Sequence, residues 1–284
     1  MTQTASATAR PTRSLPTPTT VHEATRLTPG LVRVVLRADD WSGFGEPQHA
    51  DAYVKLVFLS PGVDYPLPLD PARIRDEFPN EHWPRMRTYT VRAFDRAAGT
   101  LTLDLIVHGD EGLAGPWAAT AQPGDPMHVA GPGGGYSPDP AADWHLLAGD
   151  ESALPAIANT LERLPHDAVG AAFVEVPDAN HELALQAPDG VAVRWLHVGG
   201  GTPGSLLVPA VREWAAPAGE GHVFVHGEAG FVRDLRRHLR TERGLPLDRL
   251  SISGYWRLGA DDERWRAMKR DWNRAVEADE SGTT

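Results

Sequence analysis

The chain has 284 residues, a net charge of −11 and a pI near 5.5. This length leaves room for two domains, and the acidic balance argues against a nucleic-acid-binding surface. Cysteine is absent, which excludes disulfides, Cys-ligated iron–sulfur clusters and thiolate catalysis. Redox chemistry would therefore need an organic cofactor or a metal site without cysteine.

Lys55 and Lys269 are the two lysines among 27 basic residues, so nearly all the cationic side chains are arginine. The arginine fork suits phosphate and carboxylate partners, although a compositional bias of the genome explains the same excess. No apolar run reaches transmembrane length, so no membrane span is expected. Residues 1–19 are rich in Thr, Ala, Ser and Pro and lack an apolar signal region. We expect a disordered leader there and a cytoplasmic protein.

The first part of the chain, residues 20–140, has the pattern of an antiparallel Greek-key β-barrel. Short apolar segments alternate with polar residues and are separated by turns that contain Gly or Pro. Several strands at this spacing without long helices favour a barrel. Residues 60–84 contain six prolines and are expected to form an irregular loop. The expected strands are 32–36, 52–59, 87–93, 101–108 and 126–130.

The second part, residues 141–284, alternates between strands and helices, which predicts a Rossmann-like parallel sheet covered by helices. A final charged helix over 261–278 carries Trp265, Met268 and Trp272 on one stripe, which is expected to pack onto the body of the protein. A barrel followed by such a sheet suits an enzyme that passes a hydride between two cofactors. The expected strands are 145–149, 171–176, 191–198, 222–226 and 250–254, and the expected helices are 152–164, 205–215 and 231–243.

The run Arg87-Thr88-Tyr89-Thr90-Val91-Arg92 is the strongest candidate for a cofactor site. In a strand, residues 87 and 89 share one face, so Arg87 and Tyr89 can meet a phosphate and a ring of the same ligand. Thr90 would reach the ring through its backbone N–H or its hydroxyl at the strand end. A flavin nucleotide needs these three contacts. The alternative is an ordinary hairpin strand with a surface arginine and a core tyrosine.

A second candidate for phosphate binding follows the next strand. His108 and Gly109 lead into a loop with three glycines and then into a helix expected to open near Pro116. Glycines let backbone N–H groups approach a phosphate, and a helix N-terminus adds positive potential. The alternative is a plain link between a strand and a helix.

Three further Gly-containing turns lie in or near the α/β part. Residues 131–136 are followed by Ser-Pro-Asp-Pro rather than a helix, so they either border a flavin or link the domains. Residues 199–204 match G-x-G-x-x-G but follow the third strand, which favours a loop at the nicotinamide edge. Residues 149–156 follow the first strand, where a nucleotide pyrophosphate is expected, with Ser152 as helix N-cap. A simple capped helix is the alternative there.

Metal and hydrolase chemistry find little support. His222 and His226 share one face of a strand but lack the helical H-E-x-x-H context, so no metal site is expected. A G-x-S-x-G nucleophile elbow is also absent from the sequence.

Taken in order, these segments resemble the siderophore-interacting protein family, the ferric-siderophore reductases of the ferredoxin–NADP reductase superfamily. The Gly-Tyr-Trp-Arg-x-Gly run is its most specific sign. The likeness extends from about residue 20 to residue 272. The segments that carry it are Arg87 to Arg92, His108 to Ala118, Pro123-Gly124-Asp125, Ala148 to Pro155, His226-Gly227-Glu228 and Ser253 to Gly259.

The resemblance implies an FAD site and an NAD(P)H site. Arg87 would bind the FAD pyrophosphate, Tyr89 would stack on the isoalloxazine and Thr90 would lie near N5, so Tyr89 and Thr90 are the residues expected at the redox centre. Many relatives have Ser where this chain has Gly115, so a side-chain phosphate contact is in doubt there. The other residues implied for FAD are Val91, Asp104, Val107, His108, Gly109, Ala114, Gly115 and Trp117. Those implied at the NAD(P)H side are Gly149, Asp150, Glu151, Ser152, Glu228, Tyr255, Trp256 and Arg257.

The implied reaction is hydride transfer from NAD(P)H to FAD and then reduction of Fe(III) in a siderophore. Ferric siderophores are often anionic, so Lys55, Arg92 and Lys269 are candidate substrate contacts. Glu175, near the end of the second α/β strand, is a weak indication for NADH because a carboxylate suits a ribose diol. A monomer is expected. The alternatives are a general NAD(P)H:flavin reductase or diaphorase that serves another redox partner, and a flavin-free siderophore carrier.

Overall fold

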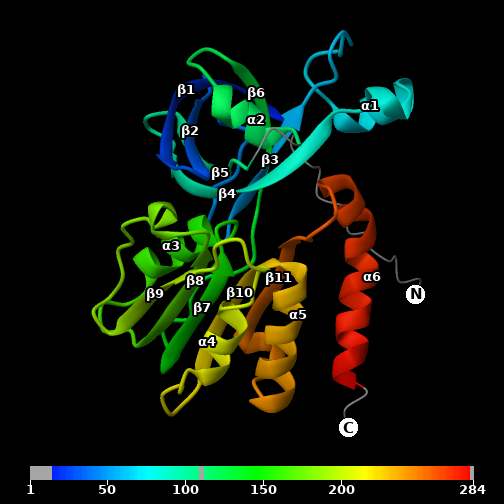
Figure 1. The fold of residues 1–284 in the computed structure, drawn as a ribbon. Helices are drawn as coiled ribbons and strands as arrows, with labels where there is room; N and C mark the ends of the chain where they lie inside the picture. The colour runs from blue at the N-terminus through cyan, green and yellow to red at the C-terminus, as the bar shows by residue number, and fades with distance from the viewer. Residues whose placement is uncertain (1–14, 109–111, 282–284) are drawn as a thin grey trace, which may run out of the picture.

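A computed structural model describes residues 15–108 and 112–281. Six antiparallel strands form a closed barrel in the order β1-β2-β5-β4-β3-β6, which confirms the predicted barrel (Figure 1). A short helix, α2 (Ala114–Thr120), lies against it. The barrel strands are β1 (Thr17–Thr28), β2 (Leu31–Arg37), β3 (Tyr53–Phe58), β4 (Arg85–Asp95), β5 (Thr100–Ile106) and β6 (Pro126–Gly133).

Alternating apolar residues of the strands fill the barrel. Val34 and Leu36 of β2 meet Val54 and Leu56 of β3 and Leu103 of β5 in one fully buried cluster. Each strand turns every second side chain inward, so this pattern leaves the intervening polar residues outside. The period-2 signal therefore located most of these strands correctly.

Two expectations for the first part need correction. The leader was expected to end at residue 19, but β1 begins at Thr17 and pairs with β6, and Thr19 donates a hydrogen bond to the Met127 carbonyl at 2.8 Å. Threonine fits a strand, yet this Thr-rich segment lacks the apolar alternation that marks the others. The loop over 60–84 contains helix α1 (Pro71–Glu77), whose N-terminus is capped by Asp70, and the 3-10 turn η1 (Asn80–His82).

The second part is a five-stranded, all-parallel sheet in the order β11-β10-β7-β8-β9, as predicted. Its strands are β7 (Trp144–Asp150), β8 (Gly170–Val176), β9 (Val191–His197), β10 (Gly221–Glu228) and β11 (Leu250–Trp256). The helices are α3 (Leu154–Arg163), α4 (Leu207–Glu213), α5 (Ala229–Arg237) and α6 (Asp262–Ser281). Short helical turns are η2 (Ala179–His181), η3 (His238–Glu242) and η4 (Leu247–Arg249).

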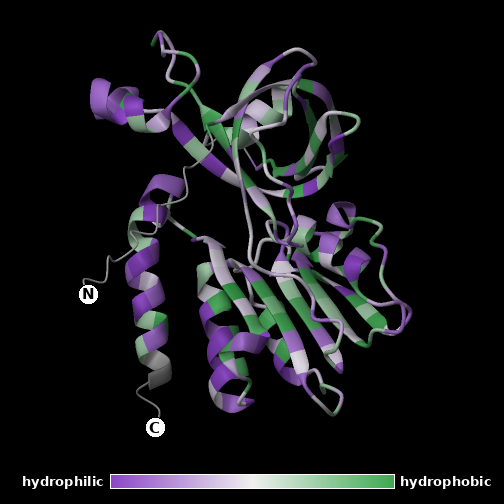
Figure 2. Ribbon diagram, turned by 180° about the vertical axis from the view of Figure 1, so that it is seen from behind, coloured by the Kyte–Doolittle hydropathy of each residue, from purple (hydrophilic) through white to green (hydrophobic). Residues whose placement is uncertain are grey.

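The helices form a layer on each face of the sheet (Figures 1 and 2). Leu147 of β7 points into the core under α3, whereas its neighbours Leu146 and Ala148 point into the core under α4 and α5. Both faces of the sheet are therefore apolar, as expected of a parallel sheet with helices on both sides.

The last helix differs from its prediction at one residue. Trp265 is buried and contacts Trp272, with ring centroids 5.6 Å apart. Met268, expected in the same stripe, is 38% exposed. Helix α6 lies along the edge of the α/β part and reaches up to the barrel only at its N-terminal end (Figure 1).

Candidate functional site

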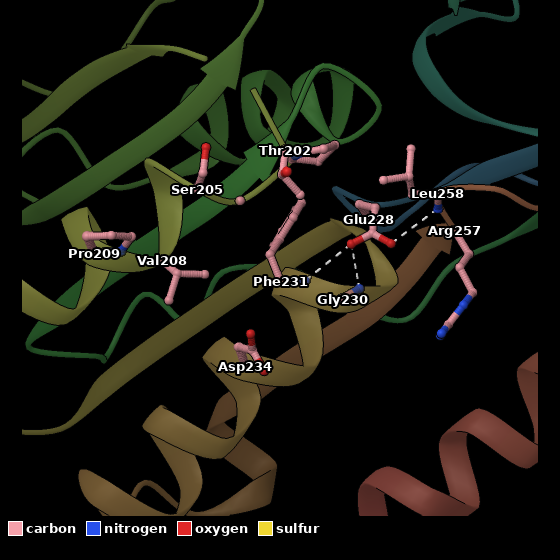
Figure 3. Close-up of a pocket in the computed structure, with 12 residues that line it drawn as sticks. Thr202, Ser205, Val208, Pro209, Glu228, Gly230, Phe231, Asp234, Arg257 and Leu258 are labelled. Carbon is pink, nitrogen blue, oxygen red and sulfur yellow. Dashed lines mark hydrogen bonds between the residues drawn. The ribbon is translucent and has the colours of Figure 1, made fainter. Parts of the chain in front are cut away.

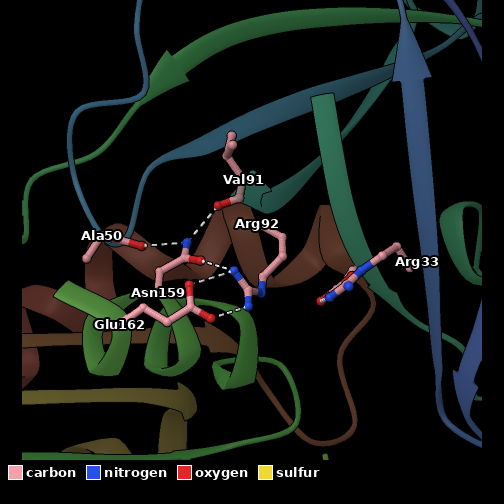
Figure 4. Close-up of polar contacts among 7 residues, drawn as sticks. Arg33, Ala50, Val91, Arg92, Asn159 and Glu162 are labelled. Atoms are coloured by element: carbon pink, nitrogen blue, oxygen red, sulfur yellow. Dashed lines mark hydrogen bonds and ion pairs between the residues drawn. The ribbon is translucent and has the colours of Figure 1, made fainter. Parts of the chain in front are cut away.

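The barrel and the sheet meet where β4 contacts α3. Buried Asn159 of α3 donates to the carbonyl oxygens of Val91 at 2.7 Å and of Ala50 at 3.1 Å. Arg92 of β4 donates to both carboxylate oxygens of Glu162 and to the Asn159 side-chain oxygen (Figure 4). Arg92 was expected at the substrate, but its guanidinium is committed to holding the two domains together.

The Arg87–Tyr89 face is built as the strand pattern predicted. Tyr89 and Arg87 lie opposite Val54 and Leu56 of β3, so the two side chains share one face of β4. Tyr89 packs against the barrel core, and burial raises the pKa of its phenol. A flat aromatic and a guanidinium thus stand together on one short segment.

Thr90 lies inside β4 rather than at its end, and it is buried. Its side chain lies beside Tyr255 of β11, whose pKa is raised mainly by burial. This contact joins the barrel to the sheet at the residues expected near flavin N5 and nicotinamide. Tyr255 also meets the ring of His226 edge-on, with centroids 4.9 Å apart.

The turn after β5 only partly matches the expected phosphate loop. The Val107 N–H donates to the Gly30 carbonyl at 2.8 Å, and His108 is exposed. Gly109 lies outside the described residues. Helix α2 begins at Ala114, two residues before Pro116, and Ala114 is buried in the barrel core. Trp117 packs edge-on against Phe58.

Gly115 lets the start of α2 approach the end of β5. A Cβ at this position would lie 3.3 Å from the Ile106 carbonyl oxygen. Asp104, also expected near FAD, is buried and accepts both hydrogen bonds of a bidentate pair with Arg33, at 2.7 and 2.8 Å. Both of its oxygens are engaged, so the geometry favours a structural role for Asp104. Val91 is likewise a core residue that offers its backbone carbonyl to Asn159.

The chain returns to the centre of the sheet after β9, so β7 and β10 flank the topological switch point. Ligands of open parallel sheets bind at the carboxyl ends of the strands there. Gly149 allows β7, β10 and the segment leading into α3 to pack closely at this point. A Cβ on residue 149 would lie 2.6 Å from both the Ala153 Cβ and the His226 carbonyl oxygen.

Asp150 organises the switch point. Its Oδ1 accepts from the Ser152 N–H at 2.9 Å and from the Ser152 hydroxyl, and its Oδ2 accepts from the Glu228 N–H at 2.9 Å and the Trp256 indole at 2.8 Å. Burial raises the pKa of Asp150. Ser152 was expected as the N-cap of α3, but Ala153 occupies that position without a side-chain cap, and the Ser152 hydroxyl serves Asp150.

The neighbouring acids differ in their surroundings. Glu228 is buried and caps α5 through the N–H groups of Gly230 and Phe231, and it also accepts from the Leu258 N–H at 3.2 Å. Glu151 is partly buried, and loss of solvation raises its pKa to about 7. A carboxyl group that ionises near neutral pH therefore stands where the pyrophosphate was expected.

A pocket of about 490 Å³ opens beside these residues (Figure 3). The Gly-rich loop after β9 forms one wall, and the start of α5 and the segment after β11 form the other. Figure 3 shows the Arg257 side chain pointing away from Glu228. The lining residues are Thr202, Pro203, Gly204, Ser205, Val208, Pro209, Glu228, Gly230, Phe231, Asp234, Arg257 and Leu258.

Glu175 does not face a ribose site as expected. It is buried, and its carboxylate accepts from the N–H groups of Gly204 at 2.5 Å, Leu206 at 3.0 Å and Leu207 at 3.1 Å. Glu175 therefore fixes the Gly-rich loop and the start of α4. The sequence signal for this role is an acid at a strand end that faces a glycine loop, and it is easily mistaken for a ligand contact.

The three candidate substrate cations are not gathered at one place. Lys55 is exposed on β3, Arg92 is in the domain contact and Lys269 lies on α6, where it donates to Ser253 at 3.2 Å. Burial lowers the pKa of Lys269. Residues 15–108 and 112–281 contain no cluster of three or more potential metal ligands, and no helix among them is long and apolar enough to cross a membrane.

Sequence reasoning missed that two acids of α6 contact Arg87 on the β4 face. Arg87 donates from both terminal nitrogens to Glu263 of α6, at 2.7 and 2.9 Å, and Asp262 lies 3.1 Å from the same guanidinium. Because Arg87 and Glu263 are 176 residues apart in sequence, no local sequence pattern predicts their contact. Asn159 was missed as well, although an amide in the apolar helix 154–161 needs a specific buried partner and could have been found by that signal.

Comparisons with known proteins match both parts of the chain. Residues 20–136 match the siderophore-interacting FAD-binding domain, and residues 142–259 match the siderophore-interacting protein model. The ferric vibriobactin reductase of Vibrio cholerae is 35% identical over 83% of this chain and 87% of its own length. The NADPH-dependent ferric-chelate reductase of Escherichia coli is 30% identical over 84% and 91%. The crystal structure of a siderophore-interacting protein from Aeromonas hydrophila superposes with a TM-score of 0.79 and 30% identity, over 92% of this chain and 99% of that one.

Proposed function

This chain belongs to the siderophore-interacting protein family, and we propose that it is an FAD-dependent oxidoreductase that uses NAD(P)H to reduce Fe(III) bound by a siderophore and so releases Fe(II). One observation carries the proposal. The Arg87–Tyr89 face of β4 and the switch point of the sheet are brought together where Asn159 of α3 donates to the carbonyl oxygens of Val91 and Ala50, next to Thr90.

The residues of the barrel suit FAD. Tyr89 offers an aromatic surface, Arg87 offers a fork for a diphosphate, and the start of α2 lies near β5. When bound, FAD accepts two electrons as a hydride and passes them on singly. Tyr89 would hold the ring in place, and Thr90 would lie between the ring and the sheet. No side chain is needed as nucleophile or general acid.

The pocket beside Glu228 suits a nicotinamide dinucleotide. Arg257 has no side-chain partner within residues 15–108 and 112–281 and lies on the pocket wall, so it is our candidate for a donor phosphate. Glu175 has no free oxygen with which to select NADH, because three backbone N–H groups occupy its carboxylate. Both NADH and NADPH are therefore candidate donors, and the printed name of the Escherichia coli relative specifies NADPH.

Iron release follows from ligand chemistry. Hard oxygen donors hold Fe(III) more tightly than Fe(II), so reduction weakens the complex. Lys55 is the exposed cation of the three candidates, and we propose it as a contact for an anionic ferric siderophore. We further propose that the protein is cytoplasmic, because the cytoplasm supplies NAD(P)H, and cell fractionation tests this. We also propose that it is a monomer, which size-exclusion chromatography tests.

The proposal is tested by flavin content and iron release together. Purified wild type should carry FAD and, with NAD(P)H, convert ferric siderophores to Fe(II) that a ferrous chelator traps. Arg87→Ala should retain less FAD, whereas Arg73→Ala, at an exposed position of α1, should retain the wild-type amount. A flavin-loaded protein that reduces dyes or protein acceptors but no ferric siderophore would support the diaphorase alternative instead.

A further inference from the structure

The N-terminal end of α6 carries two acids that grip the cation expected to bind FAD. Arg87 is only 12% exposed at its side chain, and its fork closes on Glu263 in a bidentate pair. Asp262 lies 3.1 Å from the same terminal nitrogen. Shielding from water makes such a pair stronger than a typical surface ion pair.

A diphosphate and these carboxylates compete for the same atoms. Phosphate binding by arginine uses the planar fork, and Glu263 already takes both of its terminal nitrogens. Burial is the main reason for the raised pKa of Tyr89, and the negative charge of Asp262 raises it further. Asp262 therefore also acts electrostatically on the aromatic face. Two carboxylates beside an anionic cofactor also repel it. The Arg87 guanidinium therefore cannot pair fully with the two acids and with the diphosphate at the same time.

The acids have other partners once Arg87 leaves them. Asp262 also pairs with Arg266 of its own helix at 2.8 Å. Glu263 is 51% exposed, so water can solvate its carboxylate. Release of the contact therefore leaves neither carboxylate buried without a partner or solvent.

Asp262 and Glu263 lie on the N-terminal side of the contacts that anchor helix α6. Among its residues with described side chains, Trp265 and Val276 are the buried ones. Trp265 packs on Gly254, where a Cβ would lie 3.0 Å from the indole, and Lys269 bonds Ser253. These contacts anchor the helix to β11 from Trp265 onward, so the side chains of Asp262 and Glu263 precede the anchor.

We propose that Asp262 and Glu263 form a latch on Arg87 that FAD opens, so that cofactor binding and docking of the first turn of α6 oppose each other. The inference rests on the proposed FAD site. Such coupling is reciprocal: if FAD weakens the contact between Arg87 and the two acids, that contact weakens FAD binding by the same factor. A substitution that weakens the latch should therefore tighten FAD binding.

The test measures FAD affinity in apoprotein of the full chain by quenching of flavin fluorescence. Glu263→Gln should bind FAD about three- to tenfold more tightly than wild type, as loss of one competing ion pair predicts. Asp271→Asn removes one charge from the exposed face of the same helix and should change affinity less than about twofold. Matching circular dichroism and melting temperatures verify that all three proteins are folded.

A second readout follows the helix itself. Addition of FAD to wild type should raise hydrogen exchange of the backbone amides at residues 263–266, and Glu263→Gln should show that higher exchange before FAD is added. Equal FAD affinity of wild type and Glu263→Gln would overturn the latch alone, and weaker binding would mean that the acids position Arg87 for the phosphate. A wild-type chain that takes up no FAD would overturn the proposed function together with the latch.

Discussion

The Trp256 indole donates a hydrogen bond to Asp150 Oδ2 at 2.8 Å and so ties the end of β11 to the end of β7, across β10. The same oxygen accepts from the Glu228 backbone N–H of β10 at 2.9 Å. One buried carboxylate thus fixes the ends of three strands at the switch point, where the proposed donor site lies.

Asp150→Asn should lower the free energy of unfolding by about 1–3 kcal/mol, because the amide turns an N–H group toward donors that need an acceptor. Trp256→Phe removes a single donor and should lose only about 0.5–1.5 kcal/mol. Urea unfolding followed by circular dichroism measures both. Equal stability of Asp150→Asn and wild type would contradict the organising role of this carboxylate.

The domain contact gives a second prediction. Asn159→Ala leaves the Val91 and Ala50 carbonyls without their donor and should lower the free energy of unfolding by about 2–3 kcal/mol. Glu162→Gln weakens a partly exposed ion pair and should lower it by less than about 1 kcal/mol. Calorimetry that gives the reverse order would show that the Arg92–Glu162 pair is the main link.

Arg92 and Lys55 can be separated by kinetics. Because Arg92 is held by Glu162 and Asn159, Arg92→Ala should reduce stability while changing KM for the ferric siderophore by less than about twofold. Lys55→Ala should raise that KM by about two- to fivefold, as loss of one exposed attractive charge predicts. A large KM effect of Arg92→Ala alone would restore the substrate role first expected of it.

Glu151 makes stability depend on pH. Its pKa is raised from 4.5 to about 7, so between these values the folded chain holds a proton that the unfolded chain has lost. Stability should therefore fall as pH rises through this window, and Glu151→Gln should remove that loss. Glu151→Gln should have the same melting temperature as wild type near pH 4.5 and a higher melting temperature than wild type at pH 8. Glu213→Gln, at an exposed position of α4, should show no such divergence; a constant difference at all pH values would contradict the shifted pKa.

Glu175 tests donor selection. Since its carboxylate caps the Gly-rich loop, Glu175→Gln should lower the melting temperature but change the NADH-to-NADPH ratio of kcat/KM by less than about twofold. The ratio is measured with the flavin-loaded variant at equal donor concentrations. A shift of tenfold toward NADPH would show that Glu175 senses the ribose after all.

The fold could be predicted from the sequence because its signals are local. Alternation over 32–36 and 52–59 reports one buried face of a strand, and the βα rhythm after residue 141 reports a sheet covered on both sides. β1 was missed because its threonines hide which side chains are buried. Helix ends shifted where Ser152, a good cap residue, was used by Asp150 instead.

Of the candidate site, the sequence predicted the shared face of Arg87 and Tyr89, because both residues lie on one strand, and their role toward a cofactor stays a prediction. Residues such as Asp104, Glu175 and Glu228 have the chemistry of ligand contacts, but the fold gives each of them an internal partner. Those partners are distant in sequence or are backbone groups. A single sequence does not reveal which polar side chains the fold itself will use.

The most direct measurement of the central claim is anaerobic spectroscopy of the flavin-loaded protein. NADH or NADPH should bleach the oxidised flavin absorbance, and a ferric siderophore added after the donor is consumed should restore it with formation of Fe(II). Redox-inactive gallium siderophore should not restore it. A flavin that the donor reduces but that no ferric siderophore reoxidises would contradict the account.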